Sequence, residues 1–172
     1  VAFTADAKQI VSGGADQTVK VWNVEGLVAV RTITTPSAVN AVAIVSGGAL
    51  LASAGEDNIV RIWSKGAPAV EDVKEGEAAA EGEQPLKELK GHAARVTSLA
   101  VFSNQPELLV SGSSDKTVRL WNVTTGKQVR AITHGGEVTD IAVNATGDKI
   151  ASVSSDKTAK LWNVADGKAI AA

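Results

Sequence analysis

Residues 111–123 read SGSSDKTVRLWNV, and residues 152–164 repeat this phrase with few changes as SVSSDKTAKLWNV. The phrase occurs twice more in weaker form, as SGGADQTVKVWNV at 12–24 and SAGEDNIVRIWSK at 53–65. Each copy holds one of the four tryptophans of the chain, which are Trp22, Trp63, Trp121 and Trp162. A sequence that repeats itself in this way indicates one supersecondary unit used several times.

The interval between tryptophans is regular except for one insertion. Trp63 follows Trp22 at the same interval at which Trp162 follows Trp121, whereas the step from Trp63 to Trp121 is longer. The excess coincides with residues 66–84, which are crowded with Glu, Ala and Gly and have no strand pattern. Acidic residues within it are Glu71, Asp72, Glu75, Glu77, Glu81 and Glu83, against the single base Lys74. High charge with low hydrophobicity favours a solvated loop, and an acidic docking tag is the alternative.

Each unit is predicted to contain four short strands, named a to d. Strand a is VNAVAI at 39–44, VTSLAV at 96–101 and VTDIAV at 138–143, and the first unit keeps only VAF at 1–3. Strand d is AVRTIT at 29–34, LKELK at 86–90, QVRAIT at 128–133 and AIAA at 169–172. Alternating polarity and β-branched residues favour strands, these stretches are too short for ordinary helices, and Gly, Asp and Asn between them favour turns.

These residues resemble the WD-repeat β-propeller family. The resemblance rests on Gly-His before strand a, Ser-Gly in strand b, Asp-Lys-Thr in the b–c turn and Leu-Trp-Asn closing strand c, in units of about 40 residues. It covers the whole chain except the insertion. The closing Trp-Asp of the family is here Trp-Asn at Asn23, Asn122 and Asn163, and Trp-Ser at Ser64. Ala/Val-rich repeats with "DGK" turns look like the bacterial type of the family.

The resemblance implies an all-β fold, a β-propeller of four-stranded antiparallel blades. The predicted units are blade 1 at 1–35, truncated at its start, blade 2 at 36–91 with the insertion 66–84, blade 3 at 92–133 and blade 4 at 134–172. The family usually closes with seven or eight blades, so four blades form a partial or half propeller. Because the first and last units look cut within a strand, we expect further blades of the same polypeptide, or a second copy of the chain, to complete the arc.

The family also implies a structural hydrogen-bond network in each blade, in which His, Ser, Asp and Trp join strands a, b and c. Carried over by position, blade 3 offers His92, Ser111, Asp115 and Trp121, and blade 4 offers His134, Ser152, Asp156 and Trp162. Blades 1 and 2 are expected to hold partial networks of Ser12, Asp16 and Trp22, and of Ser53, Asp57 and Trp63. Thr35 occupies the histidine position of blade 2, and blade 1 lacks that segment.

Other chemistries for these residues are disfavoured. A Ser, His and Asp cluster would suit a hydrolase, but here it recurs in successive blades and no Gly-x-Ser-x-Gly elbow exposes the hydroxyl. The two histidines lie in different blades without thiolates, which argues against zinc, and SGGADQ lacks the Lys-Ser/Thr ending of a phosphate loop. No catalytic residues, metal or cofactor are therefore expected.

A base also stands two residues before each tryptophan (Lys20, Arg61, Arg119 and Lys160), where a stem packed beside the indole is favoured over a basic binding ring.

Composition narrows the partner classes. The net charge of −2 gives no support to a nucleic-acid partner, and the absence of cysteine excludes disulfides and thiolate sites. No apolar run approaches the about 20 residues that a membrane span needs.

We therefore expect a non-catalytic protein–protein interaction scaffold, whose protein partner docks where the d–a and b–c loops meet. Candidate partner-binding residues there are Arg95, Thr97, Ser114, Glu137, Thr139 and Ser155, with Asn40 and Glu56 from blade 2. Only two phenylalanines and no tyrosine occur in the chain, so recognition should be polar. The alternative is an accessory or regulatory module of a larger bacterial enzyme or cytochrome-like protein.

Overall fold

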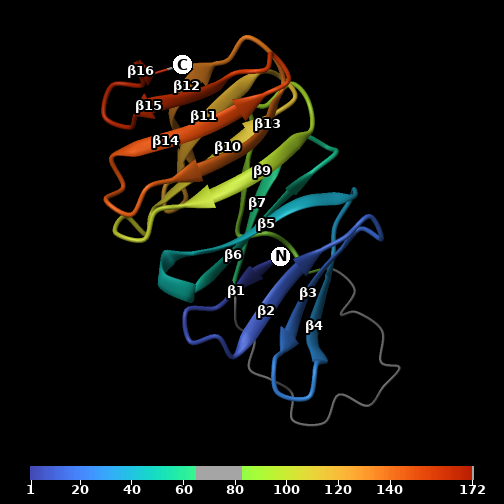
Figure 1. The fold of residues 1–172 in the computed structure, drawn as a ribbon. Coiled ribbons are helices and arrows are strands. Elements are labelled where there is room, and N and C mark those ends of the chain that lie inside the picture. The colour runs from blue at the N-terminus through green and yellow to red at the C-terminus, as the bar shows by residue number, and fades with distance from the viewer. Residues whose placement is uncertain (65–82, 172) are drawn as a thin grey trace.

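The structure is a computed structural model, and it describes residues 1–64 and 83–171. Its strands form four separate four-stranded antiparallel sheets, and within each sheet the strands follow one another in chain order (Figure 1). The predicted all-β class with four-stranded antiparallel blades is confirmed. Residues 65–82, which include most of the predicted insertion 66–84, lie outside the described residues, so its predicted loop or docking role stays a prediction.

Each blade holds four strands, which range from two to seven residues in length. Blade 1 consists of β1 (Ala2–Phe3), β2 (Gln9–Gly13), β3 (Thr18–Asn23) and β4 (Val28–Thr34). Blade 2 consists of β5 (Val39–Val45), β6 (Leu50–Gly55), β7 (Val60–Ser64) and β8 (Lys87–Leu89), with the short 3-10 turn η1 (Ser46–Gly48) after β5. Blade 3 consists of β9 (Val96–Val101), β10 (Leu108–Ser113), β11 (Thr117–Asn122) and β12 (Lys127–Thr133). Blade 4 consists of β13 (Val138–Val143), β14 (Lys149–Ser154), β15 (Ala159–Asn163) and β16 (Ala169–Ala171).

The turn between the second and third strands is built in the same way in every blade. The side chain of its aspartate accepts the backbone N–H two residues later, as in the 2.9 Å bond from Thr117 N to Asp115 Oδ1. The intervening residue adopts a left-handed conformation in all four blades: Gln17, Asn58, Lys116 and Lys157, with φ of 61°, 67°, 69° and 68°. The repeated Asp thus fixes the turn by a local side-chain to backbone bond.

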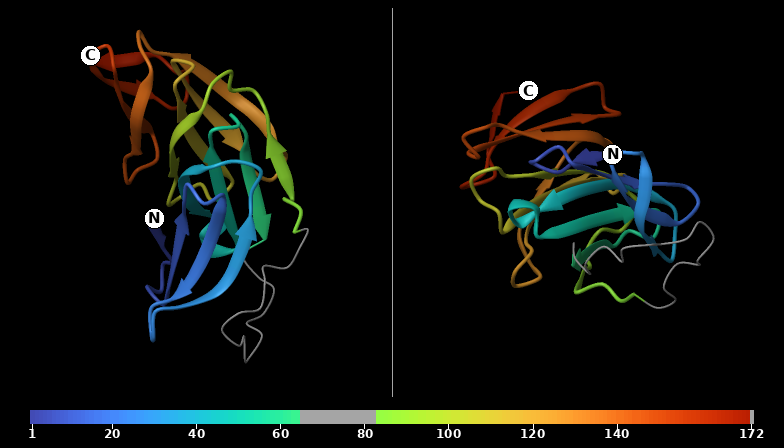
Figure 2. Two further views of the ribbon diagram at one scale, coloured as in Figure 1. Left: turned by 90° about the vertical axis from the view of Figure 1, so that its right-hand side faces the viewer. Right: turned by 90° about the horizontal axis from the view of Figure 1, so that it is seen from below.

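The blades follow one another along an open arc, with blades 1 and 4 at its two ends (Figure 2). Their first strands, β1, β5, β9 and β13, lie next to one another in chain order. Each blade has one side that carries its tryptophan, here called the Trp face, and an opposite side, the reverse face. Within the chain, the reverse face of each blade packs on the Trp face of the next.

Three hydrophobic cores fill these junctions, one between each pair of neighbouring blades. Blades 1 and 2 are joined by Val11, Val19, Val21 and Ile33 packed on Val39, Val42, Leu51 and Trp63. Blades 2 and 3 are joined by Ala43, Val45, Ala52, Ala54, Val60, Ile62 and Leu89 packed on Val96, Leu109, Trp121 and Val123. Blades 3 and 4 are joined by Phe102, Val110, Val118, Leu120 and Ile132 packed on Val138, Ile141, Ile150 and Trp162. Stability therefore comes mainly from contacts between neighbouring blades, as in other repeat architectures.

At these junctions, the first strand of one blade can approach the preceding blade closely only if the second strand of that preceding blade carries a small residue. A Cβ atom on Gly13 would overlap Val39 and lie 2.9 Å from Cγ1 of Val42. In the same way, a Cβ atom on Gly112 would lie 2.8 Å from Cγ1 of Val138. Glycine at these positions thus lets the first strand of the next blade lie directly on the reverse face.

Candidate interaction face and the networks beneath it

Blade 3 holds a continuous chain of buried side-chain hydrogen bonds. Nδ1 of His92 lies 2.8 Å from Oδ2 of Asp115, and Nε2 lies 2.6 Å from the hydroxyl of Ser111. The indole N–H of Trp121 donates to the same hydroxyl at 2.8 Å. Because a carboxylate only accepts, Nδ1 carries the proton and Nε2 accepts from Ser111. All four residues assigned to this blade from the sequence are therefore brought together.

Electrostatics in blade 3 keep the carboxylate charged and the imidazole neutral. Burial raises the pKa of Asp115, but hydrogen bonds from Thr117, the backbone of Ala93 and His92 outweigh it and lower this pKa to about 2. Burial lowers the pKa of His92, against the opposing effect of Asp115. A neutral ring between a charged acceptor and a hydroxyl suits a structural tie between strands.

Blade 4 contains the same residues but lacks one of the expected bonds. Nδ1 of His134 lies 3.0 Å from Oδ2 of Asp156, and Trp162 donates to the hydroxyl of Ser152 at 2.8 Å. Nε2 of His134 is buried without a hydrogen-bond partner among the described residues. The expectation of two complete networks is therefore wrong for the bond between His134 and Ser152.

The loop that precedes blade 4 is also built differently from that of blade 3, which has Ala93 and Ala94 after its histidine. His134 is followed by two glycines, and a Cβ atom on Gly136 would lie 2.8 Å from the backbone nitrogen of Asp156. The loop therefore lies closer to its turn than one with side chains could.

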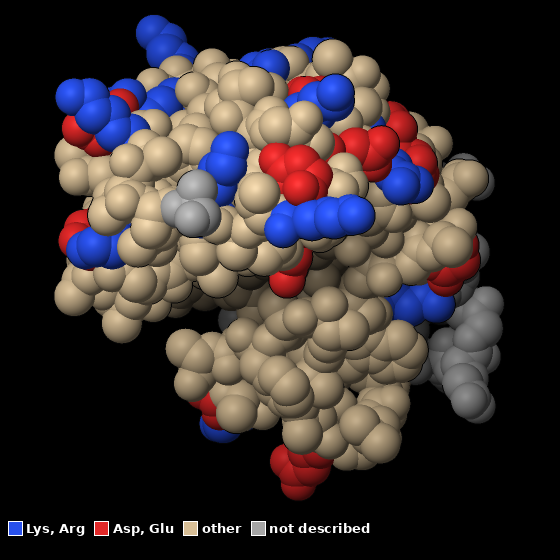
Figure 3. All heavy atoms as spheres, turned by 45° about the horizontal axis from the view of Figure 1, so that its top comes forward, with Lys and Arg blue, Asp and Glu red and all other residues tan. Residues whose placement is uncertain are grey.

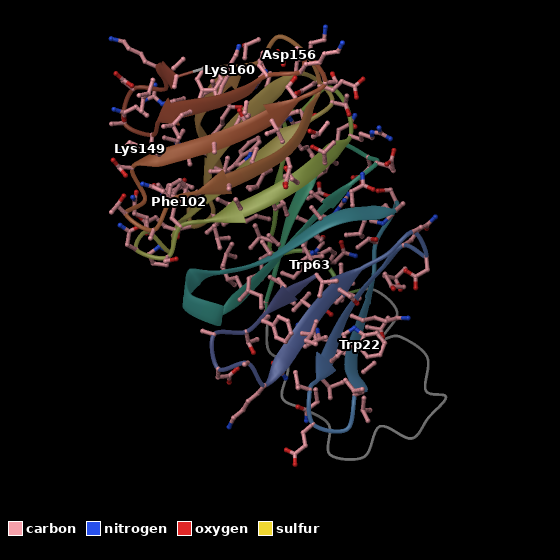
Figure 4. The ribbon with its side chains drawn as sticks, in the orientation of Figure 1. Trp22, Trp63, Phe102, Lys149, Asp156 and Lys160 are labelled. Atoms are coloured by element: carbon pink, nitrogen blue, oxygen red, sulfur yellow. The ribbon has the colours of Figure 1, made fainter. Side chains whose placement is uncertain are left out.

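Blades 1 and 2 retain the bond between tryptophan and serine without a histidine. Trp22 donates to Ser12 and Trp63 donates to Ser53, each at 2.8 Å. Thr35, at the histidine position of blade 2, is buried, but its hydroxyl donates to backbone carbonyls of Gln17 and Ser37. Figure 4 shows Trp22 and Trp63 on their neighbouring blades.

In blade 2, which lacks the histidine, Arg61 pairs with the turn aspartate instead. Nη1 of Arg61 lies 2.6 Å from Oδ2 of Asp57, and Nε lies 3.3 Å from Glu88. The corresponding distance in blade 3, from Arg119 to Asp115, is 3.9 Å, because His92 already binds that carboxylate. Arg61 thereby joins the b–c turn of blade 2 to β8, a role that the sequence pattern did not reveal.

The other bases before the tryptophans pack near the indoles. Nζ of Lys20 lies 5.9 Å from the ring centroid of Trp22, and Nζ of Lys160 lies 5.6 Å from that of Trp162. Lys20 also lies 3.4 Å from Asp16. These contacts are consistent with stems packed beside indoles rather than with a ring of free bases.

The threonine after the turn lysine is a network member that the sequence analysis missed. The hydroxyl of Thr117 donates to Asp115 at 2.6 Å, and that of Thr158 donates to Asp156 at 2.7 Å. Thr18 makes the equivalent bond to Asp16 at 2.8 Å. The recurrence of Thr two residues after the turn Asp is the sequence feature that could have identified them.

The d–a and b–c loops meet on one side of the molecule, as expected. In each of blades 2, 3 and 4 the b–c turn donates a backbone hydrogen bond to the d–a loop, for example from Ser114 N to Arg95 O at 3.0 Å. Among the candidate partner-binding residues, Arg95, Asn40, Glu56 and Ser114 form one connected group. Arg95 Nε donates to Ser114 at 3.2 Å, and its Nη1 lies 3.9 Å from Glu56, which also accepts from Asn40 at 2.9 Å. This group bridges blades 2 and 3 and remains open to solvent, since the Arg95 and Glu56 side chains are 53% and 46% exposed.

The remaining candidates divide into two kinds. Thr97 donates to the backbone carbonyls of Gly112 and Val138, at 3.0 and 2.7 Å, and so ties blade 3 to blade 4. Glu137, Thr139 and Ser155 are exposed, with Ser155 accepting from the backbone of Glu137 at 3.0 Å. Thr97 is therefore committed to the blade junction, whereas the others are open to solvent.

The charged candidates on this side do not share one sign, since Arg95 is basic and Glu56 and Glu137 are acidic. Basic and acidic side chains are interspersed over the side visible in Figure 3.

A cavity of about 330 Å³ lies at the junction of blades 1 and 2, lined by Thr34, Thr35, Pro36, Arg61, Trp63, Glu83, Gln84, Pro85 and Glu88. Across residues 1–64 and 83–171 no cluster of three His, Cys, Asp or Glu side chains could hold a metal. Within the same part of the chain, no helix has the length and apolarity to cross a membrane.

The repeated blade with its Ser–Trp and turn-Asp bonds defines a propeller-type repeat protein. The family described as "WD domain, G-beta repeat" matches residues 1–23, 28–64, 83–122 and 126–163. The chain therefore belongs to the WD-repeat family, which confirms the resemblance drawn from the sequence.

Three similar proteins, all from eukaryotes, show what the chain resembles. The chain is 31% identical to Periodic tryptophan protein 2 of Arabidopsis thaliana over 154 residues, which are 87% of this chain and 15% of that protein. It is 32% identical to Ribosome biogenesis protein YTM1 of Eremothecium gossypii over 88% of this chain and 31% of that protein. Pre-mRNA-processing factor 19 of Bos taurus is 42% identical over 41% of this chain and 14% of that protein. The expectation of bacterial-type repeats is thus not supported, and the chain spans less than a third of the length of these relatives.

Proposed function

We propose that this chain is a protein–protein interaction scaffold, and that its partner binds the side formed by the d–a and b–c loops. The observation that carries the proposal is the solvent-exposed group of Asn40, Glu56, Arg95 and Ser114, which crosses from blade 2 to blade 3. A preformed, mutually oriented set of polar groups binds with little ordering cost and can distinguish partners by charge placement. Membership of the WD-repeat family supports an interaction role.

A charge-reversal experiment tests the proposal. Arg95→Glu combined with Glu137→Arg changes two exposed side chains on this side of the molecule while the net charge stays the same. Partners recovered with the wild-type chain from cell extract should be depleted at least tenfold with this double variant. The matched control is Asp166→Lys combined with Lys168→Glu, in the c–d turn of blade 4 on the opposite side. Equal depletion by the control, or unchanged binding by the first variant, would contradict the proposed side.

A second candidate function is that of an accessory or regulatory module within a larger enzyme or cytochrome-like protein. It is favoured by the coverage of the relatives, since the chain matches only 15% of Periodic tryptophan protein 2 and 31% of YTM1. The sequence of the complete gene tests this candidate. A kinase or haem-attachment motif beside residues 1–172 would support it, and flanks made only of further repeats would count against it.

A further inference from the structure

The cavity between blades 1 and 2 is a feature of the molecule that the proposed interaction side does not use. Its volume of about 330 Å³ lies at the lower end of the range for ligand pockets, about 300 to 1,000 Å³, which suits a single side chain. The buried indole of Trp63 forms part of its wall, together with the carboxylates of Glu83 and Glu88. None of its lining residues belongs to the exposed group around Arg95.

The corresponding space in blade 3 is filled by the guanidinium group of Arg119. Its Nη1 donates to the side-chain oxygen of Gln128 and lies 2.7 Å from the position that a Cβ atom on Gly91 would take. The same Cβ position is 3.2 Å from Cη2 of Trp121. The guanidinium group therefore lies close to the loop before His92, to the start of β12 and to the tryptophan of its blade.

The same three places line the cavity in blade 2. The two blades can be aligned by the registers of their third and fourth strands and by the residue that precedes the histidine position. The counterparts are Thr34 for Gly91, Pro85 for Gln128 and Trp63 for Trp121. The cavity thus occupies the place that a guanidinium group fills in blade 3.

The arginine of blade 2 leaves this place open because it pairs with a different group. Nη1 of Arg61 lies 2.6 Å from Oδ2 of Asp57, whereas the corresponding distance in blade 3 is 3.9 Å. The side chain of Pro85 has no hydrogen-bond acceptor, so it cannot hold a guanidinium group as Gln128 does. Blade 2 therefore keeps the space for a second guanidinium group.

The charges at the cavity favour a positively charged occupant. Among the described lining residues, Arg61 is the one base and Glu83 and Glu88 are the acids, and Arg61 already faces the further carboxylate of Asp57. The Glu83 and Glu88 side chains are 29% and 34% exposed, so a ligand can reach them. Each also pairs with a base outside the cavity, which orients it and leaves further lone pairs to accept from a ligand.

We infer that this cavity binds a guanidinium group, supplied by an arginine side chain of a protein partner. The group lies beside Trp63 and donates to Glu83 and Glu88. A guanidinium group suits such a site better than an ammonium group, because it is planar, offers several donors in a fixed arrangement and packs well against aromatic rings. The site shares no residue with the group around Arg95, so either can fail without the other.

Titration with N-acetyl-arginine amide, followed by the indole N–H resonances of the four tryptophans, tests the inference. The Trp63 resonance should shift with a dissociation constant in the millimolar range, whereas the Trp121 resonance should stay in place because Arg119 fills its space. N-acetyl-citrulline amide has the same shape without the charge and should bind at least tenfold more weakly. Free arginine should also bind more weakly, because its carboxylate adds negative charge near Glu83 and Glu88.

Two variants test the charge and the space separately. Glu88→Gln should weaken binding of N-acetyl-arginine amide at least fivefold, and the matched control Glu137→Gln, exposed on blade 4, should leave it unchanged. Thr35→His returns the histidine to blade 2 and should let Arg61 fill the cavity, so that binding is lost. Circular dichroism checks folding, and Thr34→Phe, at an exposed lining position, fills the cavity instead if Thr35→His does not fold.

Several results would overturn the inference. An unmoved Trp63 resonance or equal binding of the citrulline derivative would show that the cavity does not select a guanidinium group. Unchanged binding by Glu88→Gln, or by the variant that fills the cavity, would place the ligand elsewhere. Tighter binding of free arginine than of N-acetyl-arginine amide would exclude a polypeptide as the source.

Discussion

The imidazole of His92 makes two hydrogen bonds inside blade 3, whereas the imidazole of His134 makes one in the corresponding place. Both rings lie against their tryptophan in nearly the same way, with ring centroids 6.0 and 5.9 Å apart. The two residues therefore differ mainly in the bond to serine. A buried polar group left without its partner costs more than a typical hydrogen bond contributes.

Replacement of each histidine by alanine should reveal this difference. His92→Ala leaves both Ser111 and Asp115 short of a partner and should lower the free energy of unfolding by about 3 kcal/mol. His134→Ala removes only the bond to Asp156 and should cost about 1 kcal/mol less. Urea unfolding followed by tryptophan fluorescence measures both values. Equal losses would show that the bond between His92 and Ser111 contributes nothing to stability.

The low pKa of Asp115 makes stability depend on pH in a defined range. Its folded pKa of about 2 lies below the ordinary value of 3.8, so the stabilisation is present above pH 3.8 and is lost as pH falls towards 2. The lowered pKa of His92 acts in the same direction, with stability lost as pH falls below the ordinary value of 6.5. Wild type should therefore exceed Asp115→Asn in stability at pH 6 by on the order of 2 kcal/mol, and by much less at pH 2.5.

Denaturant unfolding at a series of pH values provides the measurement. Asp16→Asn is the comparison, because this aspartate holds the same turn position in blade 1 without a histidine partner. A hydrogen bond from Thr18 lowers the pKa of Asp16 as well, but its exposure should make the pH-dependent difference smaller than for Asp115→Asn. A difference between wild type and Asp115→Asn that stays constant from pH 6 to 2.5 would be incompatible with the lowered pKa.

At the scale of strands and turns, the regular repeat is sufficient to predict most of the strands. Strand a of blade 2 was predicted at 39–44 and is observed at Val39–Val45, and strand d was predicted at 86–90 and is observed at Lys87–Leu89. Strand period, β-branched residues and the repeated Asp all act locally, which is why a single sequence is sufficient for them. The ion pair of Arg61 with Asp57 could not be predicted in this way, because Arg61 is also held by Glu88 of β8, which lies beyond the insertion in the sequence.

The spacing between blades gives a prediction at the same scale. Gly112→Ala places a Cβ atom 2.8 Å from Val138 and 3.1 Å from Ile141, and should destabilise the chain by about 2 kcal/mol. Val138→Ala alone should also destabilise, because it leaves a cavity. The double variant should lose less free energy of unfolding than the two single losses added together, because the alanine at position 138 makes room for the new methyl group.

A double-mutant cycle in urea quantifies this coupling. Val153→Ala serves as the control, since it shortens the residue at the equivalent exposed position of blade 4 and should change the free energy of unfolding by about 0.5 kcal/mol or less. Strict additivity of Gly112→Ala and Val138→Ala would mean that these residues do not limit the approach of blades 3 and 4.

Across the whole molecule, the four blades have similar sequences but unequal surroundings. Blades 2 and 3 are covered by neighbours on both faces, whereas blades 1 and 4 are covered on one. The tryptophans reflect this, since Trp63 and Trp121 are 1% exposed and Trp22 is only half-buried. These surroundings add to the differences expected from the sequence, in which blade 1 is truncated and blades 1 and 2 hold partial networks, and they follow from position along the arc.

This inequality predicts how the chain opens. In a repeat protein each unit is stabilised mainly by its nearest neighbours, so a unit with one neighbour should open more readily than a unit with two. Backbone amides of β2, β3, β14 and β15 should therefore exchange with solvent deuterium faster than those of β6, β7, β10 and β11. The measurement is native-state hydrogen exchange at submicromolar concentration, where association between copies is weakest. Equal protection of all four blades at low concentration would show instead that the arc opens as one cooperative unit, and that contacts between blades do not set the order of opening.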